Sequence, residues 1–214
     1  MLVCISTSAE AKAKDLSILF IGNSYTYLEG LSTETDPLLP KIFKQIAESI
    51  DPTLHITYSF HTPGGYSFEK HFNDPVSSKL MSGHYDEVIL QGQSIESLAL
   101  TPGWENGGNL GVKSFSAYLP KVLDLVFQNN SNVTLYVNWG WNPKKSLLQE
   151  MHPGLYFPAD SARAGQKWCG KDKFEYQAII DQSYDLHSQN YPVTLANFGD
   201  EWLKLQIAGI FNDD

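Results

Sequence analysis

The chain lacks the features that mark a nucleic-acid-binding or membrane-spanning protein. Its 214 residues include 15 Lys and Arg against 24 Asp and Glu, a formal net charge of −9, and basic residues never form a run longer than two. Nucleic acids and anionic membranes attract clustered Lys and Arg side chains, so we expect neither as a main partner. No apolar stretch approaches the roughly 20 residues of a transmembrane helix, so we expect no membrane span.

Cysteine is also scarce, since the chain has only Cys4 and Cys169. Cys4 falls in the segment 1–14, where a short apolar piece precedes Ala-Glu-Ala and Ala-Lys-Ala, which are similar to signal-peptidase sites. We interpret this segment as the remnant of a signal peptide and expect a periplasmic or secreted protein; a disordered tail is the alternative. Once Cys4 is cleaved away, Cys169 has no partner, so neither a disulfide framework nor a cysteine zinc site follows.

The remainder, residues 15–214, is long enough for one domain with a sizeable core. Apolar runs bounded by turn-forming residues predict five strands, at 17–22, 54–60, 86–91, 132–138 and 192–197. Apolar residues at helical spacing predict helices at 37–50, 114–129, 173–189 and 200–210. Strands that alternate with helices are typical of a parallel sheet covered on both faces, so we expect an α/β fold.

Glycines and polar residues follow the predicted strands where each strand ends. They form four groups: Gly22-Asn23-Ser24, Thr62-Pro63-Gly64-Gly65, Gln91-Gly92-Gln93-Ser94 and Asn138-Trp139-Gly140-Trp141. Parallel sheets bind ligands outside the carboxyl ends of their strands, so these groups are expected to converge on a cleft. Two long loops, 94–113 and 139–172, begin at the same edge, and loops of this length are usually functional or disordered. Trp139 and Trp141 either stack on a sugar ring or pack the cleft wall.

Three segments resemble the sequence blocks of the SGNH (GDSL-like) hydrolases. They are ILFIGNSYTY at 18–27, TPGGYSFEKHF at 62–72 and DEVILQGQS at 86–94, and they occur in the family's order after successive strands. The resemblance, to a branch with a Gly-Asn-Ser nucleophile block, covers nearly the whole chain. It implies a three-layer, flavodoxin-like α/β/α sandwich with a five-stranded parallel sheet. It also implies a serine esterase or acyltransferase that needs no metal and no organic cofactor.

Within this resemblance, Ser24 matches the nucleophile and Gly65 matches a backbone donor of the oxyanion hole. A serine hydroxyl becomes a good nucleophile when a base takes its proton, and N–H groups at a helix start favour negative charge. We therefore also expect the Ser24 N–H in the oxyanion hole. The plainer alternatives are that Ser24 caps the following turn and that Gly64 and Gly65 form a flexible turn.

The third oxyanion donor departs from the family pattern, in which an asparagine follows the third strand. This chain has Gln91 and Gln93, whose carboxamides offer the same donor group on a longer stem. Gln93 fits the register after the strand best, whereas Gln91 matches the glutamine of acetylesterase branches with a Gln-Gly-Glu block. We expect one oxyanion donor and one structural amide. We assign Asn23 and His71, together with the two tryptophans, to substrate binding.

The family takes its acid and base from an Asp-x-x-His near the C-terminus, and this motif is missing. None of the six histidines has an Asp three residues before it. The chain ends Gly-Ile-Phe-Asn-Asp-Asp, similar to a stretch that in relatives continues as Asp-Gly-x-His-Pro. We expect Asp214 to be the triad Asp, with Asp213 as the alternative, in a chain truncated before its His. The chain as given is then weak or inactive unless His61 or His71 serves as base; the alternative for His71 is a hydrogen-bonded supporting role.

These residues predict an SGNH-type serine esterase that removes a short acyl group, such as acetyl, from a carbohydrate or a similar polar ester. A lipase or thioesterase of the same superfamily is one alternative. A non-catalytic carbohydrate-binding relative that has lost its base is another. The expected partner is a small-molecule or carbohydrate ester. We expect no metal, because the isolated pair His152 and Asp160 lacks the spacing of metal ligands.

Overall fold

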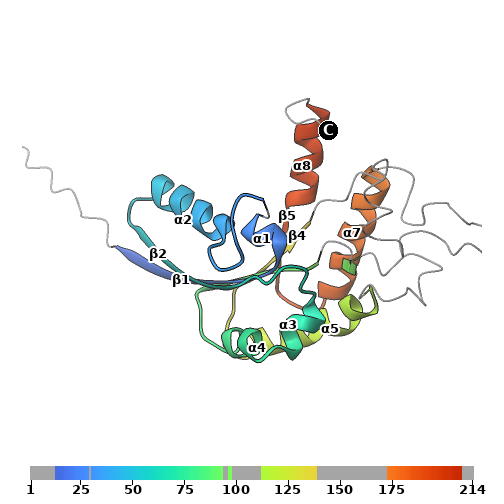
Figure 1. Cartoon of the computed structure of the whole chain (residues 1–214), viewed down its shortest axis with the longest axis horizontal. Helices are drawn as coiled ribbons and strands as arrows, with labels where there is room; N and C mark the ends of the chain where they lie inside the picture. The colour runs from blue at the N-terminus through green and yellow to red at the C-terminus, as the bar shows by residue number, and fades with distance from the viewer. Residues whose placement is uncertain (1–12, 29, 94–95, 98–111, 139–172, 209–214) are drawn as a thin grey trace, which may run out of the picture.

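The structure is a computed structural model that describes residues 13–28, 30–93, 96–97, 112–138 and 173–208. Its elements in chain order are β1 (Lys14–Ile21), α1 (Ser24–Tyr27), α2 (Leu38–Ile50), β2 (Leu54–His61), α3 (Phe68–Asn73), α4 (Pro75–Met81), β3 (Glu87–Gln91), α5 (Val112–Val126), β4 (Val133–Val137), α7 (Lys173–Ser188), β5 (Thr194–Asn197) and α8 (Phe198–Ile207). Figure 1 shows α2 on one side of the sheet and α3, α4 and α5 on the other. The expected three-layer α/β/α arrangement is therefore confirmed.

The five strands form one sheet in the order β2-β1-β3-β4-β5, and every neighbouring pair is parallel. This is the flavodoxin-like order that the resemblance implied. The crossover after β1 leads to one side of the sheet and the crossover after β3 leads to the other. The order of the strands therefore reverses between β1 and β3, at the centre of the sheet.

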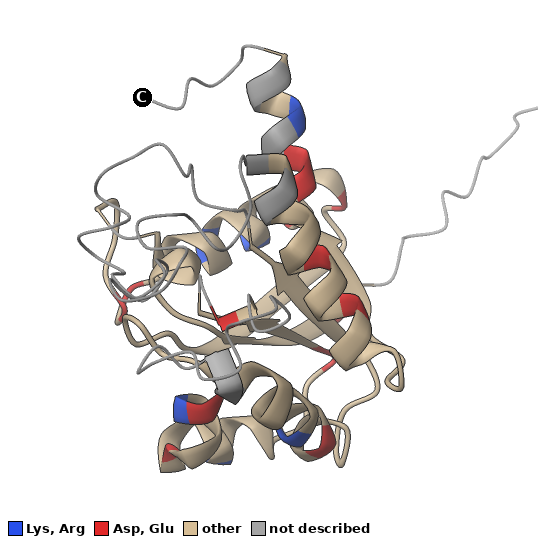
Figure 2. Cartoon of the chain, turned by 90° about the vertical axis from the view of Figure 1, so that its right-hand side faces the viewer, with Lys and Arg blue, Asp and Glu red and all other residues tan. Residues whose placement is uncertain are grey.

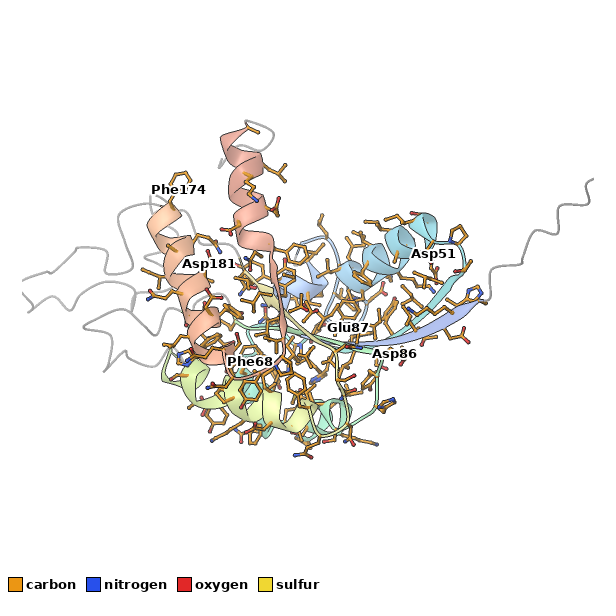
Figure 3. All side chains as sticks on the ribbon, turned by 180° about the vertical axis from the view of Figure 1, so that it is seen from behind. Asp51, Phe68, Asp86, Glu87, Phe174 and Asp181 are labelled. Atoms are coloured by element: carbon orange, nitrogen blue, oxygen red, sulfur yellow. The ribbon has the colours of Figure 1, made fainter. Side chains whose placement is uncertain are left out.

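The central strands are buried on both faces, which explains their continuous apolar sequence. On β1, Leu19 and Ile21 pack into the larger core with α5 and α7, while Ile18 and Phe20 face the smaller core beneath α2. Phe68, at the start of α3, lies among the buried side chains between the sheet and α5 (Figure 3), with its ring 5.8 Å from that of Phe115.

All five predicted strands occur, and β1 begins earlier than expected, at Lys14, because residues 14–17 pair with β2. The segment 1–12, interpreted as a signal-peptide remnant or tail, lies outside the described residues. The sequence indicated a helix start at Ser24, where α1 begins, but did not predict the short helices α3 and α4. Periodicity cannot reveal a helix of one or two turns, and the available signals were caps: Ser67 accepts from the Lys70 N–H, and Asp74 from Val76 and Ser77.

The described part of the chain contains no helix with the length and apolar character of a membrane span. Within the same part, no three His, Cys, Asp or Glu residues gather as metal ligands would. Figure 2 shows the Lys residues of the described part spread over several helices, with Asp and Glu along α7 and α8.

Candidate active site

The carboxyl ends of β1 and β3 lie side by side where the strand order reverses. Ile21 ends β1 and pairs with Leu90, one residue before the end of β3. Sheets of this kind bind ligands at such a switch point. The groups Gly22-Asn23-Ser24 and Gln91-Gly92-Gln93, which follow these two strands, are therefore brought together as the sequence predicted.

Ser24 is the first residue of α1, a single helical turn. The cap of this turn is Asn23, whose Oδ1 accepts from the Tyr25 N–H at 3.3 Å and whose carbonyl accepts from the N–H groups of Thr26 and Tyr27. The capping role that was the alternative for Ser24 is thus taken by its neighbour. Ser24 itself is half-buried, and no hydrogen bond engages its Oγ within the described residues.

Asn23 joins all three sequence blocks. Its backbone N–H donates to Gln91 Oε1 at 3.0 Å, and its side-chain Nδ2 donates to the Tyr66 carbonyl at 2.9 Å. The residue is only 1% exposed, so both bonds are shielded from water. The sequence assigned Asn23 to substrate binding, but in the structure both of its amide groups have hydrogen-bond partners inside the protein. These bonds hold Ser24 between the glycine block and the end of β3.

The two glutamines occupy different environments. Gln91 is buried, and its Oε1 accepts from the Asn23 N–H and from Thr26 Oγ1, each at 3.0 Å. Its Nε2 donates to the Gly92 carbonyl and to Asn138 Oδ1. A carboxamide has two N–H donors and two acceptor positions, so these four bonds use all that Gln91 has. Gln93 is half-buried, and its backbone N–H donates to Glu96 Oε1 at 2.5 Å.

The glycine block forms an exposed turn next to α1. Gly65 has a φ of +68°, in the left-handed region that favours glycine, and a side chain there would meet nothing within 4 Å. The neighbouring Gly64 N–H donates to Glu34 Oε2 at 3.0 Å. No hydrogen bond of the described residues engages the Gly65 N–H. Of these two amides, Gly65 is therefore the one with a donor to offer.

His71 supports the turn before Ser24 from inside the protein. The residue is 0% exposed, and its Nε2 lies 2.9 Å from the Gly22 carbonyl, which can only accept, so Nε2 carries the proton. Its Nδ1 then accepts from Ser77 Oγ at 2.8 Å, and His61 Nδ1 reaches the same hydroxyl at 2.7 Å. Both ring nitrogens of His71 are therefore engaged, which fits a supporting role better than that of a base.

Stability is expected to depend on the protonation of His71. Burial, the largest cause, lowers the pKa of His71 from 6.5 to about 4, so between these values the unfolded chain binds a proton that the folded chain does not. Acidification from pH 7 to pH 4 should therefore remove about 3 kcal/mol of the free energy of unfolding. This loss should disappear in His71→Gln, which keeps a donor and an acceptor but does not titrate. Urea unfolding at both pH values measures it.

The matched control for this experiment is His84→Gln, because His84 is exposed at the far end of β3. We expect the control to keep the pH dependence of the wild type. Equal losses of stability on acidification in the wild type and in His71→Gln would contradict the assignment.

Four predicted site residues lie outside the described residues. They are Trp139, Trp141, Asp213 and Asp214. The cleft wall and the triad Asp thus stay predictions from the sequence.

Sequence reasoning missed Glu96. It is 0% exposed and lies next to Gln93, whereas an acidic residue in a polar loop is usually solvated. It also passed over Asn138 as a supporting amide: Asn138 Nδ2 donates to the Gly92 carbonyl at 3.0 Å, and its own carbonyl accepts from Gln177 Nε2 at 3.0 Å. No local pattern of the sequence signals such contacts between distant segments.

The strand order and the two covered faces define a flavodoxin-like α/β/α sandwich of the kind that the SGNH resemblance predicted, and that prediction is confirmed. Several solved structures share this fold. The psychrotrophic esterase EstA from Pseudoalteromonas sp. superposes with a TM-score of 0.52 at 16% identity, over 91% of this chain and 81% of that one. A variant of Axe2, an acetyl-xylooligosaccharide esterase from Geobacillus stearothermophilus, gives 0.51 at 12% identity, over 90% and 81%.

TesA gives a TM-score of 0.50 at 11% identity, over 85% of this chain and 78% of that one. No family model and no curated protein sequence matches the chain. At such low identities the likeness establishes the fold and not the reaction.

Proposed function

We propose that this protein is a serine esterase of the SGNH type that acts through an acyl-enzyme on Ser24. The observation that carries the proposal is the pair of hydrogen bonds from Asn23, to Gln91 at the end of β3 and to Tyr66 after the glycine block. These bonds fix the residue before Ser24 at the switch point of the sheet, next to the glycine block, which supports Ser24 as the nucleophile. The solved structures of the same fold include esterases, which supports this class of reaction.

The proposed roles follow from the positions of the donors at the strand ends and from the hydrogen bonds that occupy Gln91. Ser24 Oγ attacks the ester carbonyl, and the backbone N–H groups of Ser24 and Gly65 donate to the oxyanion. Gln93 supplies the third donor, because the carboxamide of Gln91 is fully occupied in holding Asn23 and Thr26. Donors already in place for the developing charge contribute a large share of esterase catalysis.

The family's Asp-x-x-His motif, which supplies the base, does not occur in the 214 residues. No histidine of the chain stands in an Asp-x-x-His, and both nitrogens of His71 have partners inside the protein. We propose that Asp214 is the triad Asp and orients the histidine that serves as base. A non-catalytic, carbohydrate-binding role is the second candidate, and it is favoured by the internal hydrogen bonds that engage both ring nitrogens of His71.

One experiment separates these two candidates. We expect Gly-Ala-His appended after Asp214 to raise the rate of p-nitrophenyl acetate hydrolysis at least tenfold, because a general base typically contributes about 100-fold or more. Gly-Ala-Ala appended at the same place is the matched control and should give no gain. Equal rates for the two extended chains, with carbohydrate binding retained in Ser24→Ala, would favour the non-catalytic role.

The substrate is proposed to be a short-chain acyl ester, in particular an acetyl ester of a carbohydrate. The polar residues around the candidate site and the acetyl-xylooligosaccharide esterase among the solved structures of this fold support this choice. We expect kcat/KM for p-nitrophenyl acetate to exceed that for p-nitrophenyl decanoate by about tenfold or more. An acyl chain that is too long for the site should weaken binding of the transition state by about 1.4 kcal/mol or more. A profile that rises with chain length would instead indicate a lipase or thioesterase.

A further inference from the structure

Glu96 is a buried carboxylate that holds two backbone segments of the candidate site. The residue is 0% exposed, its Oε1 accepts from the Gln93 N–H at 2.5 Å, and its Oε2 accepts from the Phe68 N–H at 3.1 Å. Gln93 follows β3, and Phe68 begins α3 three residues after Gly65. The two N–H groups therefore belong to the two segments that carry the proposed oxyanion donors Gly65 and Gln93.

Such a carboxylate is costly to bury. Removing a charged group from water costs several kcal/mol unless strong hydrogen bonds replace the water. Here both oxygens receive backbone N–H donors, and charge-assisted bonds of this kind are about twice as strong as neutral ones. The Phe68 N–H is also one of the amides at a helix start that lack an intrahelical acceptor. The carboxylate thus satisfies groups that an apolar residue would leave unpaired.

The Glu96 carboxylate lies so close to the backbone at Gly92 that there is no room for a side chain at that position. A Cβ at Gly92 would come within 2.7 Å of Glu96 Oε1 and within 3.0 Å of the Phe68 ring. Any side chain at Gly92 would therefore push the carboxylate away from the Gln93 N–H. Burial, and then the charge of Glu96, raise the pKa of the nearby Tyr184 above its usual range, as expected for a phenol beside a carboxylate.

We propose that Glu96 is a positioning residue for the oxyanion hole, which sets Gln93 and the glycine block at the correct separation without touching the substrate. The inference rests on the proposed function of Ser24. In such a role, Glu96 contributes to the transition state and hardly at all to substrate binding. A change in geometry of about 1 Å at catalytic groups can cost about 100-fold in rate.

The test compares two isosteric substitutions in the form of the chain that hydrolyses p-nitrophenyl acetate. Glu96→Gln places an N–H₂ group against a backbone N–H, and we expect kcat to fall roughly 10- to 100-fold with KM within about twofold. The control is Asn130→Asp. Asn130 is also a buried side chain that bridges two segments, through bonds to Tyr85, Gly83 and Val126, but at the opposite end of the sheet. The control should lower the thermal midpoint and leave kcat unchanged.

Two further variants separate positioning from simple structural support. Gly92→Ala displaces the carboxylate without altering it, so it should reproduce the fall in kcat of Glu96→Gln. Glu96→Gln should also lose the part of its effect on kcat that acts through Gln93 in a Gln93→Ala background, because residues that act through one another are not additive. Gln93→Ala keeps the backbone N–H that Glu96 binds, so the cycle reports on the carboxamide.

The outcomes distinguish the inference from the function on which it rests. A parent protein without Ser24-dependent hydrolysis would overturn both. If the parent is active, the positioning role is overturned by a Glu96→Gln variant with unchanged kcat, by a fall in kcat no larger than that of Asn130→Asp at equal loss of stability, or by full additivity with Gln93→Ala.

Discussion

Ser24→Ala is expected to abolish ester hydrolysis, with a fall in kcat of about 1,000-fold or more and little change in KM. The attack on the ester carbonyl is assigned to this one hydroxyl, and its loss cannot be replaced by the donors around it. The fold should tolerate the change, because Ser24 Oγ takes no part in the described hydrogen-bond network and Asn23 provides the cap of α1. We expect a thermal midpoint within about 2 °C of the parent, since surface-type changes stay within about 0.5 kcal/mol.

Initial rates on p-nitrophenyl acetate and labelling by a fluorophosphonate test this prediction. Both are measured in whichever is more active, the 214-residue chain or the chain extended by Gly-Ala-His. The matched control is Ser49→Ala, an exposed serine of α2 whose hydroxyl bonds only within its own helix. The control should retain full rate and full labelling. Undiminished hydrolysis in Ser24→Ala would remove the nucleophile from the mechanism and leave the fold as the only link to the esterases.

The sheet was predictable from the sequence, and the short helices were not. Each strand is an apolar run between turn formers, and β1 shows why this suffices: Leu19 and Ile21 are buried on one face, and Phe20 on the other. A strand buried on both faces needs apolar residues at every position, so its composition identifies it. In α3 and α4, by contrast, a single turn or two is specified by the caps Ser67 and Asp74.

Some residues of the candidate site could likewise be identified from the sequence, and others could not. Residues whose identity follows from their own chemistry, such as Ser24 and Gly65, were assigned from the sequence blocks, and the structure places both at the expected strand ends. The sequence alone leaves the choice between Gln91 and Gln93 open, because it depends on partners 47 and 68 residues away in the chain, Asn138 and Asn23. Glu96 could not be found at all, since nothing local shows that a carboxylate is buried.

Gly22→Ala is expected to destabilise the protein and distort the site together. A Cβ at this position would overlap Thr26 Oγ1 and lie 3.0 Å from Gln91 Oε1, the two atoms that hydrogen-bond to each other beneath the serine turn. Overpacking costs about 1–3 kcal/mol, and loss of the buried bond adds about 1 kcal/mol. For a chain of this size we expect the thermal midpoint to fall by about 4–12 °C. Thermal unfolding measures the loss of stability, and the residual rate of ester hydrolysis measures the distortion of the site.

Gly30→Ala is the control, because Gly30 has a φ of +88° but nothing within 4 Å of a new Cβ. It should cost only the strain of the left-handed conformation, about 1 kcal/mol. The cost of Gly22→Ala should also shrink by about 1 kcal/mol or more in a Thr26→Ala background, where the overlapping hydroxyl is gone. If Gly22→Ala costs no more than the control, the turn before Ser24 has room to move, and the tight junction between β1 and β3 that presents the serine does not exist.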